Sequence, residues 1–213
     1  MKEEKETGRL EAFSDGVFAV AITLLVLNIK IPEVTAAPDK WLDEWPMLAA
    51  YVTSFATIGI MWINHHRLFT YIKRTDTALL LLNLLLLAII VFIPVPTALL
   101  ADAIKKFLAG TDYHPAALVY SATFFLMALC FNFLWSYASY KDRLLDTQAD
   151  PQAVQAISRQ YRFGPLFYAL IFAVAWFNTL ACIILSFMLA LFFAVPVRLP
   201  STASEKSEGE IRR

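Results

Sequence analysis

The chain has 213 residues, of which 59% are hydrophobic and 17% are charged, and its formal net charge is zero. Its apolar runs are too long and too numerous for a soluble domain of this size, so the sequence predicts an all-α integral membrane protein. The balanced charge argues against a nucleic-acid partner, and the lipid bilayer is the expected environment. No small-residue cleavage site follows a short apolar core near the start, so we expect no removable signal peptide.

The first predicted helix spans residues 8–30 and carries polar groups inside an apolar stretch. Polar side chains are costly within a bilayer unless they face a bundle interior or water, so they mark candidate functional positions. One side of this helix carries, at helical spacing, Gly16, Val20, Thr23, Leu24 and Leu27. Two interpretations are open: the small residues allow another helix to approach closely, or the stripe faces a conducted ion or a substrate.

Five further membrane-spanning helices are predicted along the chain. They cover residues 46–72, 77–101, 114–140 and the two halves of the apolar stretch 163–197, which breaks at Asn178-Thr179. Asp76 is the expected N-cap of the third helix, and Pro94 and Pro96 should kink or end it. Residues 102–113 are expected to form a loop, and Asp150-Pro151 should open a short surface helix.

The domain organisation follows from this count of six helices. Residues 1–198 are expected to form one transmembrane domain, and residues 199–213 a disordered cytoplasmic tail. With the N-terminus inside, 14 of the 18 Lys and Arg residues lie at cytoplasmic helix ends and loops. The positive-inside rule therefore predicts that both termini lie in the cytoplasm. Cys130 and Cys182 lie in apolar runs and are expected to be buried thiols.

The predicted topology brings polar side chains from three helices to one depth near the cytoplasmic surface. They are Arg9, Ser14, Asp15, His65, His66 and Asn83. A carboxylate at this depth needs a partner, and Arg9 or a histidine is the expected partner of Asp15. The group is either a structural staple that fixes the first helix against the second and third, or a proton relay. We favour the staple, because one Asp and two His residues do not make a continuous chain across a membrane.

Several other kinds of site are not indicated. Adjacent helical residues point about 100° apart, so His65 and His66 cannot chelate one metal ion. Walker, GxSxG, CxxC and HExxH motifs are absent, so we expect neither an enzyme nor a cofactor. The Thr-Val-Gly-Tyr-Gly potassium filter is absent as well. With one candidate pore helix per chain, a pore would need several copies of the chain around an axis. Thr23 would then give a ring of hydroxyls, and its leucine and valine neighbours would give apolar rings.

The stretch Arg9-x-x-x-Phe13-Ser14-Asp15-Gly16-Val17 resembles the signature of the transmembrane protein 175 family, in its prokaryotic branch. The later stretches Trp62-Ile-Asn-His-His-Arg67 and the leucine-rich helix with Asn83 and Pro94 are similar to that family too. The resemblance implies that the Phe13-Ser14-Asp15 motif holds the pore helix against its neighbours.

The resemblance also implies a potassium-selective cation channel, without the usual filter loop, that assembles as a homotetramer with the first helix lining a central pore. It assigns the hydrophobic constriction to Val20, further apolar layers to Leu24 and Leu27, and the selectivity layer to Thr23. K⁺ would be the permeant ion. Val20 is shorter than the Ile or Leu common at the constriction, so the ring there is expected to be wider, or the narrowest ring to lie at Leu24 or Leu27.

Two other functions remain open from the sequence. A proton-coupled secondary cation transporter would use Asp15 and the histidines, and such transporters often have broken helices beside their binding sites. Only Pro94 and Pro96 indicate a break of that kind, and they lie toward the outer end of their helix. The second alternative is a membrane scaffold that conducts nothing, which leaves the polar stripe of the first helix without a purpose.

Overall fold

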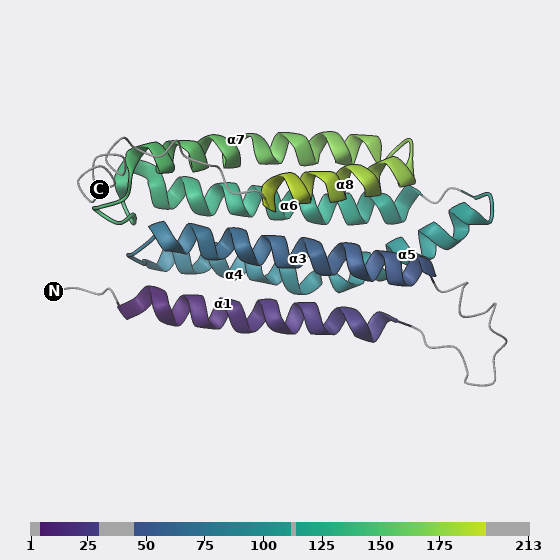
Figure 1. Ribbon diagram of the computed structural model, residues 1–213, viewed down its shortest axis with the longest axis horizontal. Coiled ribbons are helices and arrows are strands. Elements are labelled where there is room, and N and C mark those ends of the chain that lie inside the picture. The colour runs from purple at the N-terminus through teal and green to yellow at the C-terminus, as the bar shows by residue number, and fades with distance from the viewer. Residues whose placement is uncertain (1–4, 30–44, 112–113, 195–213) are drawn as a thin grey trace, which may run out of the picture.

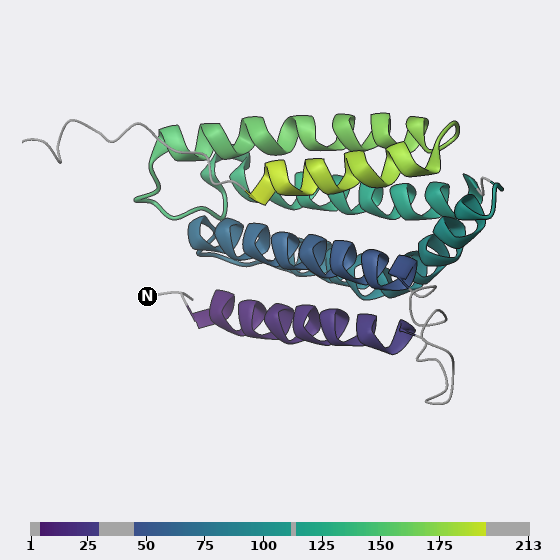
Figure 2. The same cartoon turned by 45° about the vertical axis from the view of Figure 1, so that its right-hand side comes forward.

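The computed structural model describes residues 5–29, 45–111 and 114–194, which form long helices lying side by side (Figure 1). In chain order the elements are α1 (Lys5–Leu24), the 3₁₀ turn η1 (Leu25–Asn28), α3 (Trp45–Tyr71), α4 (Thr77–Phe92), α5 (Pro94–Leu108), α6 (His114–Ser139), the 3₁₀ turn η2 (Tyr140–Asp142), α7 (Pro151–Val174) and α8 (Thr179–Ala194). α1 lies at one edge of the bundle next to α3 and α4, and α7 lies at the opposite edge (Figures 1 and 2). The predicted tail at 199–213 lies outside the described residues.

Four helical stretches among the described residues are long and apolar enough to cross a membrane. They are Thr7–Leu27, Trp45–Tyr71, Thr77–Leu108 and His114–Asp142. α7 and α8 complete the bundle as an antiparallel hairpin (Figure 1), and α8 contains a shorter apolar stretch, Thr179–Leu189. With α4 and α5 counted as one kinked segment, the predicted all-α membrane fold of six helical segments is confirmed.

The kink between α4 and α5 arises at the two predicted prolines. Ile93 separates the helices, because Pro94 and Pro96 have no N–H to donate to the preceding turn. The Thr97 hydroxyl donates to the Ile93 carbonyl (2.8 Å), and its oxygen lies 2.7 Å from the Ser54 hydroxyl on α3. The bend is therefore held by the neighbouring helix.

The loop predicted at 102–113 was wrong over most of its length, because α5 continues to Leu108. The residues after Asp102 are good helix formers, and two lysines in the last turn, Lys105 and Lys106, favour the negative end of the helix dipole. Gly110 follows the end of the helix, and its φ of 85° suits a residue without a Cβ.

The short surface helix predicted at 151 and the fifth spanning helix are one continuous helix, α7, which corrects the predicted boundary at 163. Pro165 lies inside α7 and cannot donate to the carbonyl of Tyr161, four residues earlier. The amide of Asn132 on α6 donates to that carbonyl instead (2.8 Å). Because the freed acceptor is satisfied from outside the helix, the chain continues helically through the proline.

The remaining local predictions are confirmed. Asp76 caps α4 and Asp150 caps α7, each accepting a hydrogen bond of 2.9 Å from a backbone N–H of the first turn. Asn178 does the same for α8 at 2.8 Å, which places the turn of the α7–α8 hairpin where the sequence predicted it. Cys130 and Cys182 are free, buried thiols.

Backbone hydrogen bonds join the α3–α4 turn to the connection between α6 and α7; we call this junction the loop clasp. Ile72 and Leu145 form an isolated antiparallel bridge. The backbone N–H groups of Lys73 and Arg74 both donate to the carbonyl of Leu144 (3.0 and 3.2 Å). The Arg74 guanidinium also donates to the carbonyl of Leu145 (3.2 Å). The clasp therefore ties together two connections that are distant in the sequence.

Candidate functional site

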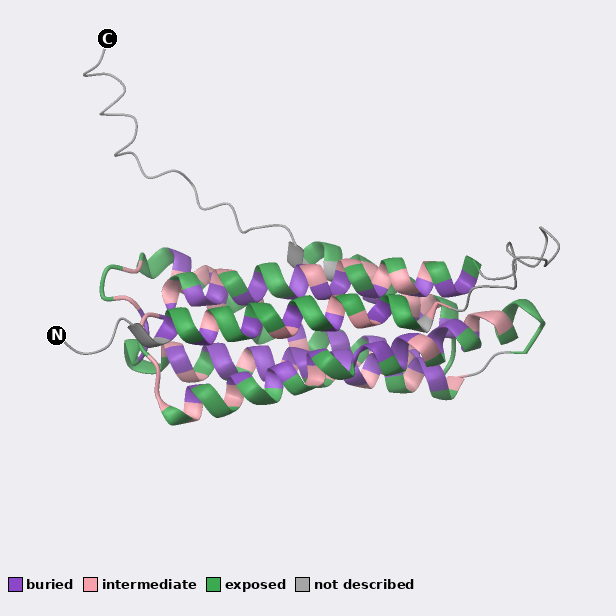
Figure 3. Cartoon of the chain, turned by 90° about the horizontal axis from the view of Figure 1, so that it is seen from below, coloured by how far each residue is buried: buried purple, intermediate pink, exposed green. Residues whose placement is uncertain are grey.

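α1 is packed on one face and open on the other. Phe18 and Leu25 are each 1% exposed and pack into the core, whereas Val20 is 53% exposed and Leu27 75% exposed. Among the four candidate membrane spans, this one has the smallest buried share. Figure 3 views the bundle from the side on which α1 lies, with exposed residues in green. The open face holds Gly16, Val20, Thr23 and Leu27 of the stripe that periodicity singled out, whereas Leu24 is half-buried.

The open face combines apolar side chains with one hydroxyl. The Thr23 hydroxyl donates to the carbonyl of Val20 (2.8 Å), which leaves its oxygen lone pairs free to accept a hydrogen bond or meet a cation. Gly16 is exposed, and a Cβ added there would meet nothing within 4 Å. Within the protomer, Gly16 therefore does not serve the close helix approach that was one interpretation of the stripe.

The C-terminal end of the stripe is wound more tightly than an α-helix. Residues Leu25–Asn28 form the 3₁₀ turn η1. Side chains three residues apart are eclipsed in 3₁₀ geometry, so Leu27 lies nearly in line with Leu24. The sequence predicts one regular helix over residues 8–30, so the 3₁₀ turn departs from that prediction.

Three of the predicted polar residues meet in the core, between α1, α3 and α4. Asn83 is fully buried, and its amide nitrogen donates to the Ser14 hydroxyl oxygen (3.0 Å). The His65 Nε2 lies 2.9 Å from the Asn83 amide oxygen, so His65 carries its proton on Nε2 and donates. Ser14 in turn donates to the carbonyl of Leu10 (2.8 Å). Within this Ser14–Asn83–His65 triad, one bond joins α4 to α1 and the other joins α3 to α4, so the triad ties the three helices together.

Asp15 does not join the triad, and the expected pairing with Arg9 or a histidine was wrong. Asp15 is one residue beyond Ser14, so it turns about 100° away from the core to the exposed side of α1. Its carboxylate accepts a hydrogen bond of 2.8 Å from the indole N–H of Trp62 on α3. The ring of His66 stacks on Trp62, with centroids 6.1 Å apart. Arg9 and Phe13 are exposed on α1, and the described side chain of Arg9 forms no ion pair with Asp15.

A second polar group, which sequence reasoning missed, ties α3 to α7. Asn64 is buried, and its amide oxygen accepts from the Arg67 guanidinium (2.9 Å). Arg67 also donates to the Gln160 side chain on α7 (3.0 Å). Beside Asn64, a cavity of about 30 Å³ is lined chiefly by apolar residues of α3, α6 and α7 and by Tyr161, which is room for about one water molecule. The sequence does carry a signal for this group, because a polar residue such as Asn64 inside an apolar span needs a partner. It does not show which residue of α7 completes the group, because Gln160 lies far along the chain.

The titratable residues near α1 do not form a metal site. His65 faces the buried triad and His66 faces Trp62, so their rings point apart as expected for neighbours on a helix. Across the described ranges, no three His, Cys, Asp or Glu side chains lie close enough together to hold a metal ion. What the arrangement offers chemically is a fixed helix that presents a hydroxyl and apolar side chains on its open face.

These features define a helical membrane protein in which one helix presents an uncovered face that carries a hydroxyl. The family described as endosomal/lysosomal potassium channel TMEM175 matches residues 9–94. A relative from Chamaesiphon minutus, named a potassium channel, is 46% identical over 198 residues, which cover 91% of this chain and 96% of the relative. The chain belongs to the TMEM175 family.

Two further comparisons extend this assignment. The crystal structure of a lysosomal potassium-selective channel TMEM175 homologue from Chamaesiphon minutus superposes with a TM-score of 0.77 and 43% identity, covering 89% of this chain and 96% of that one. An endosomal/lysosomal proton channel TMEM175 from Bos taurus is 29% identical over 211 residues, which cover 90% of this chain but only 41% of the bovine protein. The chain therefore matches nearly whole prokaryotic relatives and less than half of the bovine one.

Proposed function

We propose that this protein is a passive, potassium-selective channel formed by a homotetramer, with α1 of each subunit lining a central pore. The observation that carries the proposal is the two-faced environment of α1. Its inner face is fixed by the core and by the Ser14–Asn83–His65 triad, while its polar-striped outer face is left uncovered by the protomer. Four copies arranged around an axis would bring the four uncovered faces together.

In this arrangement the stripe supplies both constriction and selectivity. Val20, Leu24 and Leu27 form apolar rings that can close the path by excluding water. Thr23 forms a ring of hydroxyl oxygens that can contact a permeating K⁺, since its hydrogen is already committed to the Val20 carbonyl. The potassium-channel names of the Chamaesiphon relatives support K⁺ as the permeant ion.

We propose a cell-membrane location with both termini in the cytoplasm. The end of the bundle at which α1 begins also holds the α3–α4 turn and the loop clasp (Figure 1). Described basic residues gather there: Arg9, Arg67, Lys73, Arg74, Lys141, Arg143, Arg159 and Arg162. At the other end, Lys105 and Lys106 are the basic side chains among the described residues. This asymmetry supports the orientation by the positive-inside rule.

The test is ion efflux from proteoliposomes that hold a K⁺ gradient, with valinomycin defining full release and Na⁺ replacing K⁺ in a parallel series. We expect efflux without an opposing gradient, and faster for K⁺ than for Na⁺. Val20→Phe should block efflux by narrowing the ring. Val52→Phe is the matched control, since Val52 is a similarly exposed valine (59%) on α3 rather than α1. Equal efflux from both variants would show that α1 does not line the pore.

The same vesicles distinguish the other candidate functions. The proton-channel name of the bovine relative makes proton conduction the second candidate, and an internal pH dye measures it directly. Cation efflux that appears only with an opposing proton gradient would identify a coupled transporter instead. Folded protein that passes neither ion would leave a scaffold. A native mass of four times the 24.0 kDa subunit tests the tetramer independently of flux.

A further inference from the structure

An apolar groove of about 390 Å³ runs between α7 and α8 on the outside of the bundle. Eight side chains line it, and all are apolar; they include Phe167, Leu170 and Val174 on α7 with Leu185, Met188 and Phe192 on α8. The volume lies within the range of small-molecule sites in proteins, which is roughly 300–1,000 Å³. No polar group in the lining would orient a soluble ligand, so the groove suits a hydrocarbon chain.

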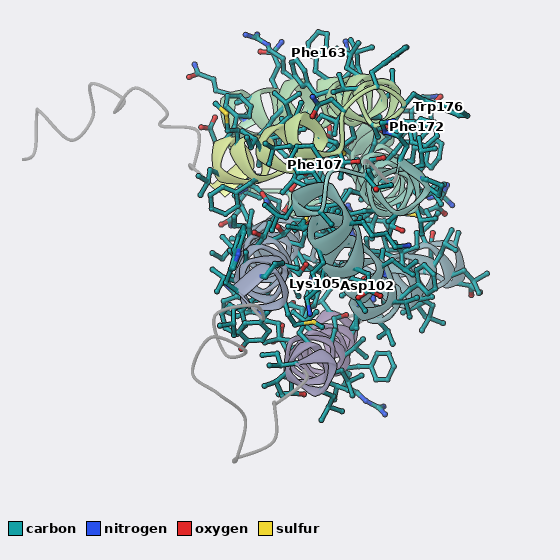
Figure 4. The ribbon with its side chains drawn as sticks, turned by 90° about the vertical axis from the view of Figure 1, so that its right-hand side faces the viewer. Asp102, Lys105, Phe107, Phe163, Phe172 and Trp176 are labelled. Atoms are coloured by element: carbon teal, nitrogen blue, oxygen red, sulfur yellow. The ribbon has the colours of Figure 1, made fainter. Side chains whose placement is uncertain are left out.

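The groove lies on the side of the protomer farthest from α1. Viewed along the helices, α1 lies at one edge and α7 at the opposite edge, with Phe163 of α7 and Trp176, which follows it, on the outside of the bundle (Figure 4). With α1 at the centre of the tetramer, which rests on the proposed function, the α7–α8 hairpin faces the lipid. The surrounding bilayer is then what covers the groove.

An exposed arginine on α7 lies beyond one end of the groove, and an exposed indole follows the other end of the helix. Phe163 continues the α7 stripe one turn before Phe167, and Arg159, which is exposed, continues it one turn further. Trp176, also exposed, lies two residues past the other end of α7. From Arg159 to Val174, the last residue of α7, the helix rises about 22 Å, which is less than the ~30 Å thickness of a bilayer hydrocarbon core. With Trp176 at one interface, the long side chain of Arg159 reaches toward the headgroups of the other while the groove lies among the acyl chains.

We propose that the α7–α8 groove binds an anionic phospholipid, with one acyl chain between the two helices and the headgroup phosphate at Arg159. The groove supplies the apolar contact area and fixes the position of the lipid. The guanidinium supplies the preference for a net negative headgroup, because it pairs with phosphate oxygens through a planar set of N–H donors.

The experiment is native mass spectrometry of the purified, delipidated protein titrated with phosphatidylglycerol or phosphatidylcholine of the same acyl chains. We expect phosphatidylglycerol to bind first, up to one per subunit. Arg159→Gln should lower the preference for phosphatidylglycerol about fivefold, the effect of one basic residue near a membrane surface. Arg162→Gln is the matched control, because this exposed arginine is on the same helix but off the stripe.

A second pair of variants tests the groove itself. Leu170→Trp should fill it and lower the binding of both lipids, whereas Leu166→Trp should not, since Leu166 is equally exposed (56% against 57%) but does not line the groove. If Leu170→Trp fails to fold, Met188→Trp blocks the groove from α8. Equal losses within either matched pair, or equal affinity for the two lipids, would overturn the proposal. The subunit count in the same spectra reports on the tetramer separately, so a wrong assembly and an empty groove give different results.

Discussion

Replacing Asn83 by Ala tests whether the buried triad is a staple for α1. Asn83 donates to Ser14 and accepts from His65, so the change removes both interhelical hydrogen bonds. Interhelical hydrogen bonds in membrane proteins contribute about 0.6 to 1.7 kcal/mol each, so the loss is about 1 to 3 kcal/mol. For a chain of this length, that lowers the unfolding midpoint by about 2 to 12 °C. Differential scanning fluorimetry of the purified protein in detergent measures the shift.

Three comparisons make this prediction refutable. Leu85→Ala, on the same helix but 53% exposed, should leave the midpoint almost unchanged. Ser14→Ala removes one bond of the two, and the double variant Ser14→Ala, Asn83→Ala should be no less stable than Asn83→Ala alone, because the two residues share that bond. If Asn83→Ala melts like the Leu85 control, the triad does not stabilise α1. If it melts normally but loses ion flux, the triad acts in conduction and the proton-relay interpretation gains support.

Three further predictions concern other parts of the chain. Asn132→Leu should lower the unfolding midpoint, because the Tyr161 carbonyl loses its donor. Adding Pro165→Ala to that variant should restore most of the lost stability, because the intrahelical hydrogen bond returns. An unchanged midpoint in the double variant would reject the pairing of Asn132 with Tyr161. Thr23→Val should shift the reversal potential under mixed K⁺ and Na⁺ toward non-selectivity, whereas Thr23→Ser should not; identical potentials in both variants would exclude a role for the hydroxyl. Partial burial of Asp76 acts to raise its pKa, but backbone and side-chain hydrogen bonds and a nearby arginine outweigh the burial and hold that pKa below the usual value. The ionised Asp76 therefore stabilises the fold at pH values above an ordinary Asp pKa of about 4. This stabilisation is lost as the pH falls through the lowered pKa. Asp76→Asn should flatten the acid side of the midpoint-versus-pH curve, and an unchanged slope would contradict this.

Much of the fold could be predicted from the sequence because its signals are local. The apolar runs, the caps at Asp76 and Asp150, and the break at Asn178 each depend on residues within one or two turns. The two faces of α1 follow from helical period alone, since Val20 and Phe18 differ by two residues and lie on opposite sides. The depth at which Ser14 and Asn83 meet follows from counting residues from the starts of α1 and α4, because both helices begin at the same end of the bundle.

Two of the errors have a common physical cause, which is that a partner far along the chain decides the outcome. α7 passes through Pro165 because Asn132, on another helix, replaces the missing donor and donates to the freed Tyr161 carbonyl. Asp15 turns to Trp62 rather than to Arg9, because α3 places an indole N–H beside the exposed side of α1. Neither pairing leaves a periodic or compositional trace, so a single sequence read along its length does not specify it.

The loop clasp also constrains how the protein is made. Its bridge joins Ile72 to Leu145, so it cannot close until the ribosome has synthesised and released residues well past α6. Domains form in the order in which the chain is synthesised, and α1, α3 and α4 therefore enter the membrane while the far side of the clasp does not yet exist. During that interval the α3–α4 turn has its free backbone groups hydrated at the membrane surface. A truncation before residue 144 would hold the nascent chain in this open form. Cleavage of the α3–α4 turn by a protease, compared during synthesis and after release, would report when the clasp closes.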